Sequence, residues 1–187
     1  MKIWKIALLC LSGLMMAGMQ SAEAKKMTPW TKGAAETGKY RNYFKELGYK
    51  QKDIDKKIAD AYYQVFEAPT RAYFDVQVNG QMMAYISDVK NRDVRTEGMS
   101  YAMMVAVQMD KPEMFNKLWR WAKYFMRHNE EGPSHGLFAW SCRVDGRRNS
   151  GGSASDGELY FVTDLLLASR RWVSFEEFNY LEEAQEL

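Results

Sequence analysis

Two acidic residues in this chain each stand where an apolar, helix-length stretch begins. Glu97 lies in Arg95-Thr96-Glu97-Gly98-Met99-Ser100-Tyr101, and Asp156 lies in Ala154-Ser155-Asp156-Gly157-Glu158-Leu159-Tyr160-Phe161. Hydrolysis of a sugar linkage normally needs two carboxyl groups, one protonated to donate to the leaving oxygen and one ionised. Acids at the mouths of two helices therefore supply the kind of group that glycoside hydrolysis requires.

Helix capping is the structural alternative for both acids, because the helix dipole stabilises a carboxylate in the first turn. For an arbitrary acid in such a place, capping is the commoner role. A proton donor must also hold its proton near neutral pH, which the dipole opposes. Glu97 can act as an acid only if something else, such as a nearby Asp156, offsets the dipole. Glu158 fits the capping interpretation well, since it can complete the first turn after Asp156.

Structural and functional interpretations also apply to the neighbouring polar and aromatic residues. Asp93, in a charged connector, is expected to be solvated, and Arg95 is expected to form a surface ion pair. Trp140 stands in a polar, Gly-rich stretch rather than on a periodic apolar face. It is therefore a better candidate for stacking on a sugar ring than Trp119 or Trp121, which are expected in the core.

The composition excludes some classes of function. The chain has 187 residues, 26 basic and 24 acidic, so neither a nucleic-acid-binding surface nor an acidic tail is indicated. A hydrophobic content of 47% with 14% aromatic residues is sufficient for a core. Many aromatic side chains suit a carbohydrate ligand, but they suit a plain helical core equally well.

Residues 1–24 are predicted to be a signal peptide. Lys2 and Lys5 give a positive start, residues 6–19 are apolar, and Ala22-Glu23-Ala24 gives the small-x-small pattern. The apolar run is too short for a membrane span. We expect an exported protein, periplasmic or extracellular, with no membrane anchor in the mature chain.

Removal of the signal peptide leaves Cys142 as the one cysteine, so no internal disulfide is expected and the thiol is interpreted as a core residue. The sequence has no CxxC or HExxH pattern, and its histidines are His128 and His135. Neither a metal site nor a cofactor is expected.

The hydrophobic spacing predicts a mainly helical chain with one β-hairpin, around Asn79-Gly80 within residues 72–86. Thr96 is the expected N-cap of a buried helix that runs to about Met109. Other helices are expected at 40–47, 54–65, after Pro112, from Asp156 to about Trp172, and from Ser174 onward, and residues 129–155 are expected to form a long loop. The last segment reaches Leu187 without a stop signal, so the chain is expected to be truncated.

Several ordered motifs from Asp93 to Leu187 resemble glycoside hydrolase family 8. They are Asp93-Val94-Arg95-Thr96-Glu97-Gly98-Met99-Ser100-Tyr101, Leu118-Trp119-Arg120-Trp121-Ala122-Lys123, Gly136-Leu137-Phe138-Ala139-Trp140-Ser141-Cys142, Asp156-Gly157-Glu158-Leu159-Tyr160-Phe161 and Phe178-Asn179-Tyr180-Leu181-Glu182-Glu183-Ala184. The resemblance is greatest to members that release xylose from the reducing end of xylo-oligosaccharides. It implies an all-α fold, an incomplete (α/α)6 barrel with a small β-hairpin, in which residues 25–187 are the N-terminal part of an inverting catalytic domain.

The resemblance also implies roles for three residues. Glu97 is at the position of the general acid, Asp156 holds the sugar at the cleavage point and helps to distort its ring, and Trp140 is the stacking aromatic. Ala102 departs from the family by replacing a glycine, and Ser153-Ala154-Ser155 stands where a proline-containing turn is common. The family's general base lies further along the chain than Leu187. The 187-residue product is therefore expected to be inactive, whereas its full-length parent is expected to hydrolyse xylo-oligosaccharides.

Three other functions stay open from the sequence. The first is an endo-acting family 8 activity on cellulose, mixed-linkage β-glucan or chitosan. The second is a non-catalytic glycan-binding protein that keeps the contacts of Trp140 and Asp156. The third is a structural helical domain in which both acids are caps. The sequence gives no indication of an oligomeric state.

Overall fold

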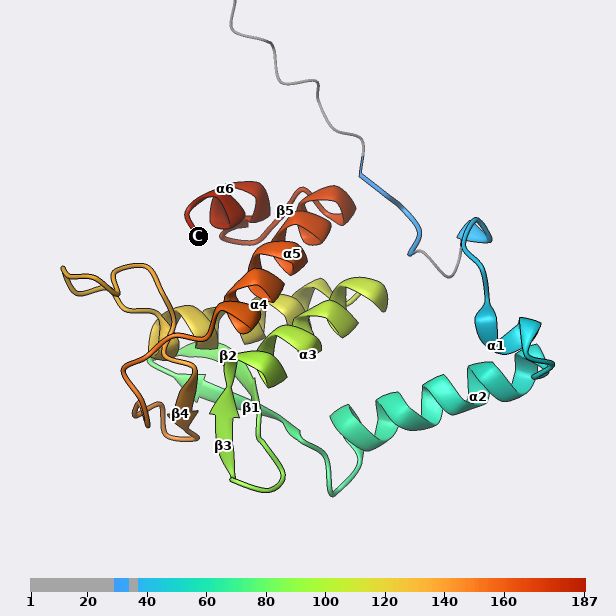
Figure 1. Ribbon diagram of the computed structural model, residues 1–187, viewed down its shortest axis with the longest axis horizontal. Helices are drawn as coiled ribbons and strands as arrows, with labels where there is room; N and C mark the ends of the chain where they lie inside the picture. Colours follow the sequence, from blue (N-terminus) through green and yellow to red (C-terminus); the bar gives the residue numbers. More distant parts are fainter. Residues whose placement is uncertain (1–28, 34–36) are drawn as a thin grey trace, which may run out of the picture.

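The computed structural model describes residues 29–33 and 37–187. The predicted signal peptide, residues 1–24, lies outside the described residues. The described chain is rich in helices and carries three two-stranded sheets (Figure 1). The helical prediction is confirmed, and the single predicted hairpin is accompanied by two further small sheets.

A helical arm formed by the two predicted N-terminal helices lies to one side of the body in Figure 1. Helix α1 is Tyr43–Glu46, α2 is Gln51–Tyr62, and α2 continues into the π-turn η2, Tyr63–Glu67. The Asn42 side chain accepts a hydrogen bond from the Lys45 amide at 3.1 Å and caps α1. Helix α2 buries only Ile54 along its length, so most of its apolar side remains accessible.

The predicted hairpin is confirmed. Strand β1, Tyr73–Val78, pairs with β2, Gln81–Ile86, through a two-residue turn. Asn79 and Gly80 have φ values of 49° and 82°, as a type I′ turn requires at both positions. Strand β2 packs on α4, Pro112–Trp121, which begins at the proline as predicted and continues into η3, Ala122–Met126.

Helices α3, Thr96–Gln108, and α5, Ser155–Arg171, lie side by side and run in the same direction (Figure 1). Gly157 meets Thr96 at one end of the pair. At the other end, Arg171 forms an ion pair with Asp110 at 3.3 Å. The parallel pairing brings the first turns of both helices to the same edge of the molecule.

The core lies where these two helices meet α4. Its largest fully buried side chains include Trp119, Trp121, Phe115, Phe138, Phe161, Met99 and Met103. The expectation that Trp119 and Trp121 are core residues is confirmed. The prediction that α3 is a buried helix is confirmed for most of its surface but not for the side of Tyr101, which is 52% exposed. Thr96 is also not the N-cap: it is the first helical residue, and the N-cap is Arg95.

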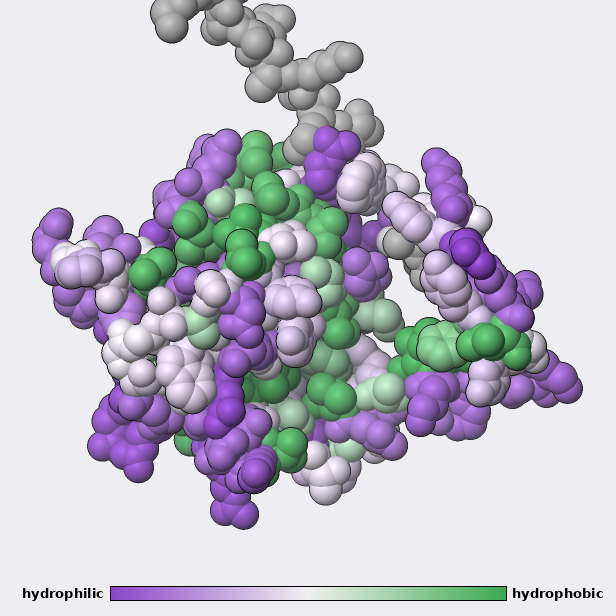
Figure 2. All heavy atoms as spheres, viewed as in Figure 1, coloured by the Kyte–Doolittle hydropathy of each residue, from purple (hydrophilic) through white to green (hydrophobic). Residues whose placement is uncertain are grey.

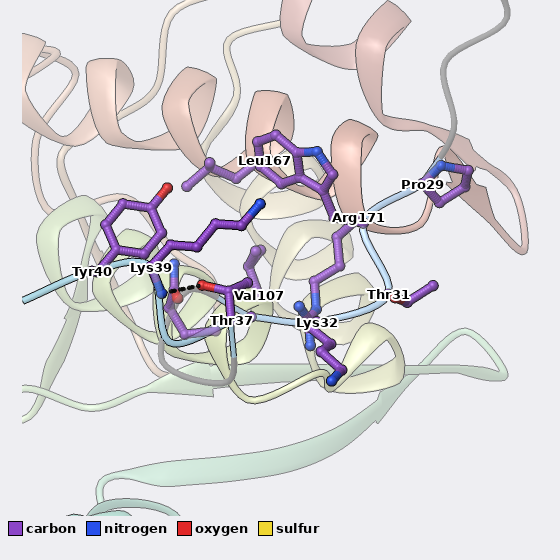
Figure 3. A pocket seen from close by; sticks show the side chains of 12 residues that line it. Pro29, Thr31, Lys32, Thr37, Lys39, Tyr40, Val107, Leu167 and Arg171 are labelled. Atoms are coloured by element: carbon purple, nitrogen blue, oxygen red, sulfur yellow. Dashed lines mark hydrogen bonds between the residues drawn. The ribbon is translucent and has the colours of Figure 1, made fainter.

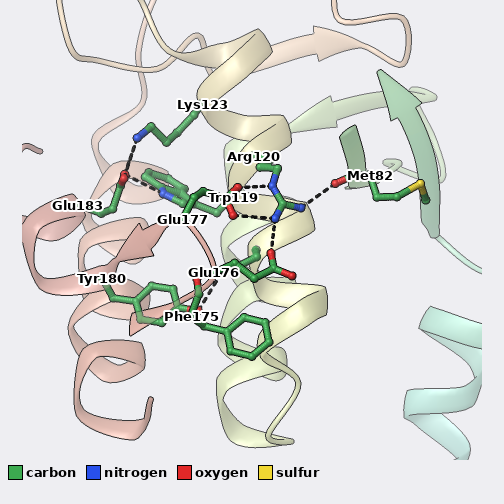
Figure 4. A network of polar contacts seen from close by, with 10 residues as sticks. Met82, Trp119, Arg120, Lys123, Phe175, Glu176, Glu177, Tyr180 and Glu183 are labelled. Atoms are coloured by element: carbon green, nitrogen blue, oxygen red, sulfur yellow. Dashed lines mark hydrogen bonds and ion pairs between the residues drawn. The ribbon is translucent and has the colours of Figure 1, made fainter. Parts of the chain in front are cut away.

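The segment from Ser174 was predicted to be one amphipathic helix, and its first part is instead a small hairpin. Strands β5, Ser174–Phe175, and β6, Phe178–Asn179, precede α6, Tyr180–Gln185. Arg120 of α4 binds both glutamates of the hairpin turn, Glu176 and Glu177, and donates to the Met82 carbonyl at 2.8 Å (Figure 4). These contacts with a distant helix select the turn, which local helical periodicity does not predict.

Polar contacts also join α6 to α4 and to η3. Glu183 accepts hydrogen bonds from the Trp119 indole at 2.9 Å and from the Lys123 ammonium at 2.7 Å (Figure 4). The buried Tyr180 hydroxyl donates to Asn116 Oδ1 at 2.8 Å. Figure 2 shows hydrophobic residues gathered over α5 and α6, where Leu159, Leu166 and Leu181 are exposed.

The predicted long loop contains a short strand that the sequence did not indicate. Strand β4, Ser141–Arg143, pairs antiparallel with β3, Asp93–Arg95, with Arg95 opposite Ser141. Arg148 holds the returning part of the loop by donating to the Phe125 carbonyl at 3.2 Å and to the Arg127 carbonyl. The pairing places residue 140 next to the start of α3. Within the described residues, no helix is both long and apolar enough to cross a membrane.

Candidate active site

Three separate segments meet at Thr96, whose side chain is fully buried. The Thr96 amide donates a hydrogen bond to the Trp140 carbonyl at 3.0 Å. A methyl group placed on Gly157 would lie 2.4 Å from both Cβ and Oγ1 of Thr96, so α5 approaches α3 here as only a glycine permits. Glu97 follows Thr96 directly and Asp156 precedes Gly157 directly. The structure therefore brings the chain segments of Glu97, Trp140 and Asp156 to one place.

Glu97 is the second residue of α3 and is partly exposed. Its Oε2 accepts a hydrogen bond from Thr96 Oγ1 at 3.3 Å. The next residue, Gly98, lets the helix approach β2, since a Cβ there would lie 3.3 Å from Cγ2 of Ile86. Within the described part of the chain, Glu97 forms no ion pair and accepts no bond from a backbone amide.

Asp156 is the second residue of α5 and is exposed. In the described chain its carboxylate has no hydrogen-bond partner and no ion pair. The capping interpretation holds for both acids only as an interaction with the helix dipole, because neither caps an amide by a hydrogen bond. Both carboxylates are accessible to a ligand.

Glu158 lies in the first turn of α5, as the capping interpretation expects, but its carboxylate binds an amide outside that helix. Its Oε1 accepts a hydrogen bond from the Phe138 amide at 2.8 Å. Phe138 is buried, with its ring centroid 5.7 Å from that of Trp119 and 5.2 Å from that of Phe161. Glu158 therefore fixes the loop two residues before Trp140.

Trp140 is half-buried and is held by both of its backbone groups. Its amide donates to the Gly152 carbonyl at 3.0 Å, and its carbonyl accepts from Thr96. The Arg95 guanidinium carbon lies 5.3 Å from the centroid of the indole ring, which places a cation over one face.

Asp93 in turn holds Arg95. Its carboxylate accepts from Arg95 Nε at 3.0 Å and from Ser141 Oγ at 2.9 Å. The expectation that Asp93 is solvated is wrong, because its side chain is only 13% exposed. The expected surface pair is instead a partly buried one beside the candidate site.

From the sequence, Tyr101 and Tyr160 had no predicted role. Each stands four residues after one of the acids, Glu97 or Asp156. The two rings contact each other edge to face across α3 and α5, with centroids 5.2 Å apart and an interplanar angle of 89°. The i, i+4 spacing in two of the quoted motifs was a signal for them, but only the pairing of the helices brings them together.

Asp164 is a third residue for which the sequence predicted no role. It is fully buried on α5, and neither carboxylate oxygen has a hydrogen-bond partner among the described residues. Burial raises the pKa of Asp164 to about 8. The carboxyl group therefore holds its proton at neutral pH.

Cys142 is buried as predicted. Burial raises the pKa of its thiol to about 11, which is unsuited to a nucleophile at neutral pH. No group of three or more His, Cys, Asp or Glu side chains in residues 29–33 and 37–187 is placed to hold a metal ion.

Two hollows border α3. The larger, of about 830 Å³, lies between residues 29–33 and 37–40 on one side and the C-terminal ends of α3 and α5 on the other (Figure 3). Gln108 of α3 and Arg171 of α5 line this hollow. At a rise of 1.5 Å per residue, Gln108 lies about 17 Å along α3 from Glu97, so the hollow is far from the acid. The smaller, of about 430 Å³, is an apolar groove between α2 and α3 that reaches Gly98 and Tyr101. Neither hollow is lined by Glu97 or Asp156.

Comparisons with known proteins give a concordant result. The sequence profile of glycosyl hydrolases family 8 matches residues 71–187. A reducing end xylose-releasing exo-oligoxylanase from Halalkalibacterium halodurans is 46% identical over 165 residues, which cover 86% of this chain and 42% of that protein. One from Bifidobacterium adolescentis is 46% identical over 134 residues, covering 72% of this chain and 34% of the relative.

A solved structure of a reducing-end-xylose releasing exo-oligoxylanase also matches, with a TM-score of 0.74 and 44% sequence identity. The match covers 83% of this chain and 41% of that one. The chain thus spans about a third to two fifths of the length of these proteins.

Proposed function

This chain belongs to glycosyl hydrolase family 8, and on that premise we propose that the complete gene product hydrolyses xylo-oligosaccharides and releases xylose from their reducing end. The meeting of three segments at Thr96 carries the proposal. Glu97 follows Thr96 and Asp156 precedes Gly157. The contacts at Thr96 therefore place both acids beside the loop that carries Trp140. The names of the similar proteins support the substrate class.

In the proposed reaction Glu97 is the general acid. It gives its proton to the oxygen of the scissile bond as the bond from C1 to that oxygen breaks. A water molecule attacks C1 from the opposite face and loses a proton to a general base, which in inverting enzymes stands roughly 6.5–9.5 Å from the acid. Asp156 binds the sugar ring on the C1 side of the break, and Trp140 stacks on a ring.

We further propose that α3 and α5 are neighbouring inner helices of an (α/α)6 barrel and that α4 and α6 lie outside them. The parallel direction of α3 and α5 supports this, as does the packing of α6 on α5 and of α4 on α3. The chain spans about 42% of the H. halodurans relative, and the family resemblance assigns the base to a later segment. We therefore expect residues 1–187 alone to lack hydrolytic activity.

The export of the mature protein to the periplasm or the medium, after loss of residues 1–24, is part of the same proposal. It can be tested by N-terminal sequencing of the protein recovered outside the cytoplasm. A mature N-terminus near Lys25 is expected, whereas an intact N-terminus on cytoplasmic protein would contradict export.

The function is tested by incubating the complete gene product with xylotriose and following the products by proton NMR. Xylose and xylobiose are expected, with the new reducing end of xylobiose first in the α configuration because inversion changes the β linkage. Cellotriose is the comparison substrate, and preferential cleavage of cellotriose would favour the endo-acting alternative. Binding of xylotriose without any cleavage would favour a glycan-binding protein.

A further inference from the structure

We propose that Tyr101 and Tyr160 are substrate-binding residues, whose hydroxyl groups form the floor of the site beneath Glu97 and Asp156. The inference rests on the proposed function and adds two residues to it. It starts from their equivalent positions on two helices, since each tyrosine follows its acid by four residues. Four residues advance a helix by about 6 Å and return to nearly the same side. Each tyrosine therefore lies one turn deeper than its acid on the same side of its helix.

The direction of helical side chains brings the tyrosines toward the acids. Every Cα–Cβ bond in a helix tilts toward the N-terminus, so a long side chain covers the turn that precedes it. On α3 that turn carries Glu97, and on α5 it carries Asp156. Because the two helices run in the same direction, both rings lean toward the same edge of the molecule.

The contact between the rings fixes their positions across the two helices. The centroids are 5.2 Å apart and the planes are perpendicular, an arrangement that aromatic pairs favour. The close approach of Gly157 to Thr96 one turn away sets the spacing of the helices. A ring pair held in this way is an ordered surface rather than two independent side chains.

The pair is nevertheless left open to solvent. Tyr101 is 52% exposed and Tyr160 is 41% exposed. Within the described chain, neither hydroxyl makes a hydrogen bond, whereas the buried Tyr180 and Tyr73 hydroxyls both do. Two ordered aromatic residues with free hydroxyl groups next to two accessible carboxylates can hydrogen-bond the hydroxyl groups of a sugar ring seated between the acids.

The test replaces each tyrosine by phenylalanine in the complete gene product. Phenylalanine keeps the ring contact and removes only the hydroxyl. We expect Tyr101→Phe and Tyr160→Phe each to lower kcat/KM on xylotriose about threefold to tenfold, the effect of losing one neutral hydrogen bond. The melting temperature should stay close to that of the wild type, which a purely structural role for the hydroxyl would not predict.

Tyr49→Phe is the matched control. Tyr49 is also exposed and edge to face with another ring, Phe44, and its hydroxyl likewise makes no hydrogen bond within the described chain, but its segment contains neither acid. It should leave kcat/KM within twofold of the wild type. The inference would be overturned if kcat/KM stayed within twofold of the wild type for both Tyr101→Phe and Tyr160→Phe. If Glu97→Gln still abolished hydrolysis in that case, the proposed function would stand. Absence of both hydrolysis and xylotriose binding in the wild type would overturn the two together.

Discussion

Gly157 and Thr96 touch so closely that a single added methyl group on Gly157 would lie 2.4 Å from two side-chain atoms of Thr96. This contact joins the first turns of α5 and α3, and each first turn carries one of the candidate acids. The relative position of Glu97 and Asp156 is thus set by a contact between two residues that have no chemical role of their own.

Gly157→Ala should therefore impair both stability and activity. Overpacking in a close helix contact costs about 1–3 kcal/mol, and the acids would move apart. A lower melting temperature and a kcat/KM on xylotriose reduced at least tenfold are expected in the complete gene product. Gly151→Ala is the control, since a Cβ at Gly151 meets nothing within 4 Å. Equal behaviour of the two variants would contradict this account of the contact.

Glu158→Ala should loosen the loop that carries Trp140. It leaves the Phe138 amide without its acceptor, and an unsatisfied buried donor costs about 1–3 kcal/mol. We expect a lower free energy of unfolding, together with faster amide hydrogen exchange in the Trp140 loop. Glu113→Ala removes an exposed first-turn acid of α4 and serves as the control. Unchanged exchange in the loop would count against a positioning role for Glu158.

Asp164 should make the folded protein less stable as the pH rises. Burial raises its pKa to about 8 in the folded state, against about 3.9 in an unfolded chain. Between these values the unfolded state has released the proton that the folded state retains, so the stabilising contribution present below pH 4 is lost progressively up to pH 8.

Asp164→Asn removes this titration with little change in shape. The free energy of unfolding, measured by urea unfolding at pH values from 4 to 8, should fall more steeply with pH for the wild type than for the variant. The difference should reach up to a few kcal/mol over the whole range. Parallel curves for the two proteins would show that Asp164 does not titrate in this window.

Arg95→Met should weaken sugar binding through Trp140. The guanidinium over the indole and its ion pair with Asp93 hold the ring in place. The loss of one such contact, worth about 0.5–1 kcal/mol at an accessible site, predicts a KM raised about twofold to fivefold with a smaller change in kcat. Arg71→Met is the control, because Arg71 lies 5.4 Å from the ring centroid of Phe74 in another part of the fold. A KM that responds equally to both substitutions would refute a specific role for Arg95.

Local signals in the sequence predicted the elements that local interactions determine. Asn79-Gly80 gave the hairpin, and Pro112 gave the start of α4. The strands of two or three residues were not predictable in this way. Ser141–Arg143 is a strand because it meets Asp93–Arg95, and the turn at Glu176 is selected by Arg120 from a distant helix.

The same distinction applies to the site. The motifs in which they stand predicted Glu97 and Asp156 as candidate site residues, and an unusual polar context predicted Trp140. Tyr101 and Tyr160 became a pair only when the parallel packing of α3 and α5 was known. Asp164 resembled any other polar residue of a helix, and its burial depends on what packs around it.

The central claim, that Glu97 is the proton donor, is tested most directly by Glu97→Gln in the complete gene product. Glutamine keeps the size of the side chain but carries no acidic proton. We predict that kcat on xylotriose falls about 10²–10⁴-fold, the usual contribution of a general acid, while the melting temperature is unchanged. A kcat within about threefold of the wild type would contradict the claim, because that loss is far smaller than the contribution of a general acid. Glu97 would then be only a charge at a helix terminus.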